Sequence, residues 1–217
     1  MLEGLIFGRS IAARRAVLRS HFDVRRQFEE IEESCIPSYV HANRLAAWVA
    51  WQRNKKAGEL YRRYAPVGPI LDFGAATGEV GHLIPKRGPY LIIEQDEALA
   101  RACEQWQQAT RTSLEKAQAG SFAAIFALDS LEHNEDIPAI VAKLVPLLRS
   151  DGVLILSGPT ESALYRLGRK IAGFSGHYHH STIYDIERIV SGHLSLVKAR
   201  KVPFAPALFR VTVWRRP

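Results

Sequence analysis

The chain has little of what marks disulfide-rich, membrane-spanning or disordered proteins. Its 217 residues include only 2 cysteines, Cys35 and Cys103, which are too few and too far apart for a disulfide framework or a zinc site. No run of about 18 uncharged apolar residues occurs, so no segment is expected to span a bilayer. With 47% apolar and 24% charged residues, the composition is that of a globular protein able to bury a sizeable core.

The N-terminus also lacks the order of residues that a secretory signal requires. Residues 1–20 place a brief apolar patch before the arginines, whereas a signal has its basic residues first and a longer apolar run after them. Free thiols persist in reducing compartments. We therefore expect a cytoplasmic protein in which both cysteines are buried thiols.

Charge is distributed unevenly along the chain. Residues 1–66 hold 12 Lys/Arg and 7 Asp/Glu, residues 67–157 hold 7 and 12, and residues 158–217 hold 10 and 3. The basic ends could attract an anionic substrate, a membrane surface or nucleic acid, although a solvated basic face would give the same counts. Nucleic acid is not expected, because no aromatic platform is interleaved with the basic residues. The arginines expected to recognise a phosphate or carboxylate, or to make peripheral contact with anionic lipid, are Arg14, Arg15, Arg19, Arg25 and Arg26.

The first third of the chain has the spacing of helices. Val24, Phe28 and Ile31 follow i, i+4, i+7 spacing, and Pro37 is expected to end any helix there. Asn43 can cap the next helix, whose apolar and aromatic stripe continues to Tyr64. Such a stripe either lines an acceptor pocket or forms simple core. The pattern predicts a helical N-terminal cap over residues 1–66.

From residue 67 onward, short apolar runs alternate with helical patterns. Strands are predicted at 70–73, 90–93, 122–128 and 153–157, with helices at 99–106 and 138–148, and Asp151-Gly152 is expected to end the second helix. Segments 194–202 and 209–214 alternate like two further strands. This order predicts an α/β domain over residues 67–217. Its sheet should be Rossmann-like, doubly wound and mostly parallel, with a C-terminal antiparallel strand.

The strongest chemical signal is the segment ILDFGAATGEVG, residues 70–81. A strand that ends in Asp72 runs into a turn in which Gly74, Ala76 and Gly78 leave the backbone N–H groups open to a ligand. The next strand ends in Glu94, where a carboxylate would meet the two hydroxyls of a ribose. Together the two features predict a nucleotide-like ligand.

These motifs resemble the class I S-adenosylmethionine-dependent methyltransferases, in their small-molecule branch. The segments that carry the resemblance are LDFGAATG (71–78), LIIEQDEAL (91–99) and the stretch 122–162 that contains LDSLEH. The resemblance implies a Rossmann-like fold and S-adenosylmethionine as the cofactor. The residues it implies for cofactor binding are Asp72, Gly74, Ala75, Ala76, Gly78, Glu94, Gln95, Leu128 and Asp129.

Two features depart from that family or compete with it. The acidic residue usual after the third strand is missing from the segment 109–120, which has no clear strand, and Thr112 or Ser113 could substitute for it. Residues 76–81 also fit the pattern that binds a dinucleotide pyrophosphate. Asp72 would be unfavourable beside a pyrophosphate, so a nicotinamide-dependent oxidoreductase is the more distant alternative.

The segment after the strand at 122–128 supplies candidate catalytic residues. Glu132 and His133 follow Asp129 at the carboxyl edge of the expected sheet, where either could act as a base toward the methyl acceptor. In similar enzymes such a set binds magnesium, and a purely structural role in the loop is also open. We assign no metal here.

A second cluster lies in the loop GHYHHS, residues 176–181. His177, Tyr178 and His179, with Tyr165 before them, are predicted to contact the acceptor, because the family often inserts acceptor-binding elements in this region. Exposed histidines with ordinary hydrogen bonds are the alternative interpretation.

The sequence therefore predicts an enzyme that moves a methyl group to a small-molecule or lipid-like acceptor, for which the basic flanks allow an anionic group. Oxygen is the first choice of acceptor atom, with nitrogen or carbon next. A cofactor-binding regulatory protein without activity is the alternative. Every recognisable cofactor motif begins at residue 70, so the cap is expected to serve the acceptor and not the cofactor.

Overall fold

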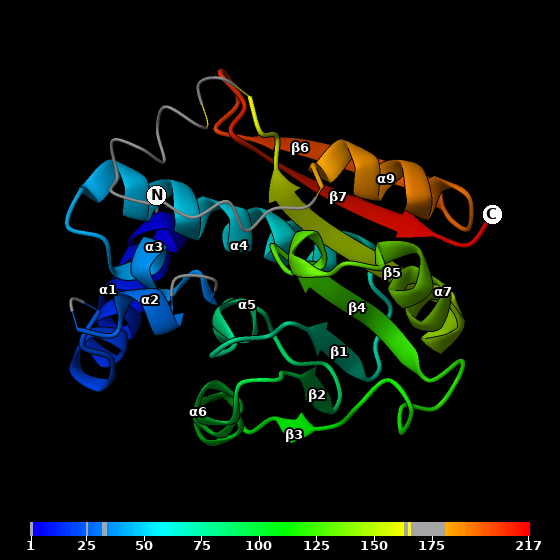
Figure 1. Ribbon diagram of the computed structural model, residues 1–217, viewed down its shortest axis with the longest axis horizontal. Helices are drawn as coiled ribbons and strands as arrows, with labels where there is room; N and C mark the ends of the chain where they lie inside the picture. The colour runs from blue at the N-terminus through cyan, green and yellow to red at the C-terminus, as the bar shows by residue number, and fades with distance from the viewer. Residues whose placement is uncertain (1, 25, 32–33, 163–164, 166–180) are drawn as a thin grey trace.

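A single seven-stranded sheet organises the computed structural model, which describes residues 2–24, 26–31, 34–162, 165 and 181–217 (Figure 1). The strand order is β3-β2-β1-β4-β5-β7-β6. The strands are β1 (Ile70–Phe73), β2 (Tyr90–Ile93), β3 (Thr110–Arg111), β4 (Phe122–Leu128), β5 (Leu148–Pro159), β6 (Ser195–Val202) and β7 (Phe209–Arg215). Strands β1 to β5 pair in parallel, whereas β7 runs antiparallel between β5 and β6. The Rossmann-like sheet with an antiparallel C-terminal strand is confirmed.

Several of the helices begin at residues whose side chains accept hydrogen bonds from free backbone N–H groups. Asn43 accepts from the N–H groups of Leu45 and Ala46, and Asp96 accepts from that of Leu99. Thr182 and Asp185 form a reciprocal capping box. The helices are α1 (Leu2–His21), α2 (Phe28–Ile31), α3 (Ile36–Val40), α4 (Arg44–Tyr64), α5 (Glu79–Leu83), α6 (Glu97–Gln107), α7 (Ile137–Leu147) and α9 (Ile183–Ser191).

Side chains alternate across the sheet and form a core on each face. Ala124 and Phe126 of β4 belong to the core that includes residues of α4, α5 and α6. Ile125 and Ala127 of the same strand belong to the core formed with α7 and α9. The sheet is therefore covered on both sides, which agrees with its nearly continuous apolar strands.

The N-terminal helices form a third apolar cluster at the end of the sheet. Leu18 of α1, Ile36 of α3 and Trp51 of α4 pack there with Ala76 and Leu99. Helix α4 also contributes to the core against the sheet, so it belongs to both layers. The predicted boundary at residue 66, between the N-terminal cap and the α/β domain, stays a prediction. Helix α4 joins the cap to the domain, because it packs in the cores of both.

Three local predictions are wrong. Helix α1 stops at His21 and Val24 lies in a turn, so the helical spacing through Val24 is interrupted and only the four residues of α2 are helical. Pro37 stands in the first turn of α3, where its missing N–H has no helical partner to lose. Asp151 and Gly152 lie inside β5, because α7 already ends at Leu147.

The sheet changes direction of winding between β1 and β4, since β2 and β3 lie on one side of β1 and β4 and β5 on the other. Such a switch point leaves a crevice at the carboxyl ends of the strands, which is where doubly wound sheets bind ligands. None of the helices in the described part of the chain has both the length and the apolar character needed to cross a bilayer.

Phe126 tests how far the fold depends on the face covered by α4. Its side chain is fully buried in the central strand β4, and its ring lies 5.6 Å from that of Tyr61. We expect Phe126→Ala to lower the free energy of unfolding by about 3–5 kcal/mol, since the cavity would not close. Phe204, which is 87% exposed, provides the control, and Phe204→Ala should change the value by less than about 0.5 kcal/mol. Urea unfolding measures both, and equal losses would contradict this assignment of the core.

Candidate functional site

A cavity of about 350 Å³ lies at the switch point of the sheet, at the carboxyl ends of β1, β2 and β4. Its size falls within the range of small-molecule sites. The described residues that line it are Ser34, Cys35, Tyr39, Asn54, Asp72, Phe73, Gly74, Ala75, Ala76, Glu79, Val80, Ile93, Glu94, Gln95, Asp96, Leu99, Leu128, Asp129, Ser130, His133 and Asn134. The N-terminal helices thus supply one wall and the sheet edge the other.

The turn after β1 packs closely against its neighbours at two glycines. Gly74 has φ of +67°, and a Cβ there would lie 2.4 Å from the Cβ of Ser130 in the turn after β4. Gly78 has φ of +77° and begins α5, and a Cβ there would lie 2.6 Å from the Cys103 sulfur. Any side chain at either position would push the loop out of place. The glycines of the motif are therefore steric requirements of this cavity wall.

Glu94 joins the ends of β1 and β2. Its carboxylate accepts the backbone N–H of Ala76 at 2.7 Å and that of Asp96 at 3.0 Å. Ala76 has φ of +45°, a left-handed conformation that is unusual for a residue with a Cβ. The Glu94 bond supports this conformation, which is how alanine replaces the middle glycine of the motif.

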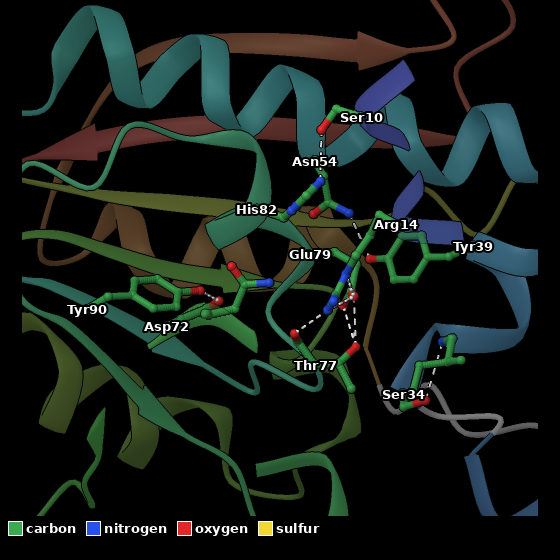
Figure 2. Close-up of polar contacts among 12 residues, drawn as sticks. Ser10, Arg14, Ser34, Tyr39, Asn54, Asp72, Thr77, Glu79, His82 and Tyr90 are labelled. Carbon is green, nitrogen blue, oxygen red and sulfur yellow. Dashed lines mark hydrogen bonds and ion pairs between the residues drawn. The ribbon is translucent and has the colours of Figure 1, made fainter. Parts of the chain in front are cut away.

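Asp72 is a buried acid in the cavity wall, only 3% exposed. The hydroxyl of Tyr90 donates to its carboxylate (Figure 2). Burial raises the pKa of Asp72 to about 7, even though the Tyr90 hydrogen bond lowers it. Asp72 therefore titrates near neutral pH.

The N-terminal helix is locked onto the same turn by Arg14 (Figure 2). Its guanidinium donates to the Glu79 carboxylate at 2.9 Å and to the Thr77 carbonyl at 2.8 Å, and the Thr77 hydroxyl also donates to Glu79. Arg14 stacks 4.5 Å from the Trp106 ring centroid and is 5% exposed. Its predicted role in binding an external anion or lipid is wrong, because internal partners use its donors.

The cap also brings polar side chains to the opposite wall. Arg53 of α4 forms an ion pair of 2.6 Å with Asp129, with both side chains more than nine-tenths buried, and lies 4.2 Å over the Phe209 ring. Asn54, next along the helix, donates to the Tyr39 hydroxyl at 2.9 Å. The sequence analysis missed all of these cap residues. A signal was available, since Arg53 and Asn54 interrupt the buried stripe of α4.

Glu132 and His133 occupy different positions. His133 lines the cavity, whereas Glu132 is fully buried and does not. Burial, and then the nearby Asp129 charge, raise the pKa of Glu132 well above its usual range. No group of His, Cys, Asp or Glu side chains in the described ranges could hold a metal ion.

The structure brings most of the predicted cofactor residues together on the cavity wall. Those that line it are Asp72, Gly74, Ala75, Ala76, Glu94, Gln95, Leu128 and Asp129. Gly78 supports the turn from behind, and Tyr165 packs edge-on against Phe209, at 5.2 Å between ring centroids, and not on the cavity. Thr112 and Ser113, the proposed substitutes for the missing acid, do not line it either. The predicted acceptor residues His177, Tyr178 and His179 lie outside the described residues.

Cysteine burial was predicted for both thiols. Cys103 is buried as predicted, but Cys35 is only partly buried and lines the cavity.

Comparison of the sequence with protein-family profiles finds no match, and comparison with curated proteins finds none either. Solved structures do match. The N-methyltransferase NodS from Bradyrhizobium japonicum, bound to S-adenosylhomocysteine, has a TM-score of 0.65 at 16% identity, covering 78% of this chain and 88% of that one.

Two further structures agree. The magnesium protoporphyrin IX methyltransferase ChlM from Synechocystis, also bound to S-adenosylhomocysteine, gives a TM-score of 0.63 at 19% identity, covering 81% of this chain and 89% of that one. A putative type 11 methyltransferase from Sulfolobus solfataricus gives 0.58 at 14% identity, covering 72% and 89%. The predicted methyltransferase fold is confirmed by these similarities.

The raised pKa of Asp72 predicts a pH-dependent cost to stability. The unfolded chain releases this proton near pH 3.8 and the folded chain near pH 7, so stability falls as pH rises between these values and levels off above them. Asp72→Asn keeps an acceptor for Tyr90 without the charge. Measured by urea unfolding, the variant should therefore gain on the wild type by up to about 1.4 kcal/mol per pH unit across that window. Parallel curves for the two proteins would show that Asp72 is ionised throughout.

Proposed function

We propose that the protein is a methyltransferase that moves the methyl group of S-adenosylmethionine to a nucleophilic atom of a small-molecule or lipid-like acceptor. One observation carries the proposal. A glycine turn with no room for a Cβ, and a carboxylate at the end of the neighbouring strand, face one cavity at the switch point of a methyltransferase fold. The neighbours by structure are methyltransferases, two of them bound to S-adenosylhomocysteine.

The residues present fit this cofactor. Glu94 lies where a carboxylate can accept from ribose hydroxyls, and the backbone of residues 74–76 lies open beside it. The described residues of the wall include several acids and no lysine or arginine, which suits a ligand with positive charge. When bound, the cofactor supplies an electrophilic methyl group on a sulfonium. The chain then has to position the acceptor and exclude water, which is the work we assign to the cap.

His133 is the candidate base, because it alone of the predicted catalytic pair lines the cavity. Glu132, buried without contact to the cavity, acts on the acceptor only through its neighbours. The aromatic and histidine residues of the segment 165–180 remain proposed acceptor contacts, although Tyr165 packs against Phe209 and is not among the residues that line the cavity. We place the enzyme in the cytoplasm. Peripheral contact with anionic lipid is proposed for Arg26, which is 88% exposed, and for Arg25, which lies outside the described residues. Arg15 and Arg19 instead donate to the carbonyls of His41 and Val40.

Two alternatives are separated from this proposal by direct assays. A nicotinamide-dependent oxidoreductase would bind NAD, which the acidic Asp72 beside the turn disfavours. A regulatory protein would bind S-adenosylmethionine but transfer nothing. Incubation with methyl-labelled S-adenosylmethionine and a metabolite extract should yield a labelled small molecule, and calorimetry should detect S-adenosylhomocysteine binding and no NAD binding.

Glu94 provides the first test of the cofactor assignment. Glu94→Ala removes charge-assisted hydrogen bonds worth about 1.5–3 kcal/mol, so affinity for S-adenosylhomocysteine should fall roughly ten- to a hundredfold. Glu115→Ala is the matched control, because Glu115 is exposed and lies outside the cavity wall. Calorimetry on both proteins decides the matter, and unchanged affinity in Glu94→Ala would remove the ribose assignment.

Arg14 tests whether the cap also serves the cofactor. Without Arg14, the turn at Thr77 and Glu79 loses the hydrogen bonds that order it in the free protein. The ligand would then have to order this turn when it binds, which makes the free energy of binding less favourable. We expect Arg14→Ala to lower affinity for S-adenosylhomocysteine about tenfold and to destabilise the protein, since it leaves Glu79 buried and unpaired. Removal of residues 1–21 should act in the same direction.

The control for Arg14 is Arg26→Ala, because Arg26 is 88% exposed. Calorimetry well below the unfolding temperature separates loss of affinity from loss of fold. If Arg14→Ala binds as the wild type does, the cap serves the acceptor alone, as the position of the motifs in the sequence suggested.

A further inference from the structure

Beside the cavity, buried carboxylate oxygens have no hydrogen-bond donor in the described part of the protein. They are Oδ1 of Asp129 and both Oε atoms of Glu132, and the hydroxyl of Ser130 is also unpartnered. A buried acceptor without a donor costs about 1–3 kcal/mol, so native structures rarely leave several together. Glu132 lies outside the cavity wall, so the two groups of this cluster that a ligand in the cavity could reach are Oδ1 of Asp129 and the hydroxyl of Ser130.

Arg53 satisfies only part of the need. It pairs with Oδ2 of Asp129 and stacks on Phe209, so it neutralises one carboxylate without reaching the other oxygens. No lysine or arginine is among the described residues that line the cavity, whereas five acidic residues are: Asp72, Glu79, Glu94, Asp96 and Asp129. Glu79 and Asp129 are paired with Arg14 and Arg53, and the other three have no arginine partner among the described ion pairs. An anionic acceptor would find acids and no cation on this part of the wall, whereas a neutral acceptor would meet no repulsion and a cationic one would be attracted.

The cluster lies next to the proposed cofactor loop. Asp129 and Ser130 both line the cavity, and Ser130 packs so closely on Gly74 that no Cβ fits between them. Asp129 has φ of +51°, a strained conformation for this residue, which is typical of residues held in place by a functional site. An acceptor atom at Asp129 would therefore stand beside the loop that we assign to the methyl donor.

We propose that the methyl acceptor is an amine, whose N–H groups are received by the Asp129 carboxylate and the Ser130 hydroxyl. The inference rests on the proposed function, which left the acceptor atom open. It selects nitrogen in place of oxygen, the first choice from the sequence. The number of donors carries the choice. The free Asp129 oxygen and the Ser130 hydroxyl can each accept one hydrogen bond. A primary amine brings two N–H donors for them, an alcohol brings one O–H, and a carboxylate or phosphate ester would place further acceptors beside Asp129.

The transfer step balances without a base at the moment of reaction. The amine enters in its neutral form, its lone pair forms a bond to the methyl carbon, and the carbon–sulfur bond breaks with its electron pair going to sulfur. The N–H protons stay on nitrogen, so the positive charge passes from sulfonium to ammonium. Asp129 would lie against this developing charge and stabilise it. An alcohol would instead require a base to remove its proton.

Glu132 is a positioning residue in this scheme. It is fully buried, lies outside the cavity wall and is close enough to Asp129 for the two charges to interact. Burial raises the pKa of Glu132, which favours its neutral form. The neutral Glu132→Gln side chain has nearly the same shape and should preserve the reaction.

The chemical class of the product tests the proposal on the wild-type protein. After incubation with methyl-labelled S-adenosylmethionine and a metabolite extract, a labelled amine moves into organic solvent from strong base and stays in water in acid. A labelled methyl ester would release labelled methanol in base. A neutral ether would partition between water and organic solvent in the same way at every pH. We expect the amine pattern. An ester or ether overturns the inference but not the proposed function, whereas the absence of any labelled product overturns both.

Variants then assign the residue. Asp129→Asn should lower label in the amine fraction about a hundredfold, the loss expected for one charge-assisted hydrogen bond to a reacting group, with a much smaller change in S-adenosylhomocysteine affinity. Ser130→Ala, the gentler change, should lower it several-fold. The matched control is Asp151→Asn, because Asp151 is exposed at the opposite end of β5.

The fold of each variant is checked by thermal unfolding, since Asp129→Asn leaves Arg53 with a weaker partner. If Asp129→Asn and Ser130→Ala both fold and both methylate the amine at the wild-type rate, these residues do not receive it. Retained activity in Glu132→Gln, together with loss in Glu132→Ala, would support positioning, and full loss in Glu132→Gln would contradict the neutral role given to Glu132.

Discussion

The ion pair between Arg53 and Asp129 holds the two walls of the cavity together. Arg53 belongs to a helix of the cap, Asp129 to the turn after the central strand β4, and both side chains are almost fully removed from water. Burying such a pair is costly, and removing one partner costs more than the pair ever contributes. Its value therefore lies in position, because it fixes the middle of α4 against the turn after β4 and leaves one Asp129 oxygen for another donor.

A second buried ion pair, Arg14 with Glu79, repeats this design at the other end of the cavity. It joins the first helix to the turn that begins α5, with Thr77 between them. Two guanidinium groups from the N-terminal helices thus reach two turns of the sheet. The cap is therefore part of the site, because Glu79 in one turn and Asp129 in the other would be buried without a cationic partner if the cap were absent.

The charges of the cavity explain what kind of ligand suits it. Acidic side chains predominate among the described lining residues, and burial raises the pKa of Asp72 to about 7. Glu132, behind the wall, shifts in the same direction. A low-dielectric site with several acids and no lysine or arginine among its described lining residues favours positive charge on its ligands. A sulfonium donor meets that condition when it binds, and an amine acceptor meets it as its nitrogen becomes an ammonium during the transfer.

Much of the fold and the cofactor side of the site followed from the sequence alone, because both depend on short-range patterns. Alternating apolar runs predicted the parallel sheet, and a glycine turn after one strand with Glu94 after the next predicted the ligand at the switch point. Residues separated by a fixed number of positions in a βαβ unit meet at the same edge whatever the rest of the chain does. The positions of Gly74 and Glu94 follow from that rule.

The tertiary structure alone decided what the arginines do and what closes the cavity. Arg14 looked like a surface cation and is buried, whereas Arg53 drew no attention and pairs with Asp129 across 76 positions of the chain. Such long-range pairs depend on how helices dock, and no local spacing encodes that. For the same reason the contact of Tyr165 with Phe209 could not be read from the sequence. Glu132 and His133 differ in exposure for a local reason, since consecutive residues of the 3-10 turn Leu131–His133 lie about 120° apart around its axis.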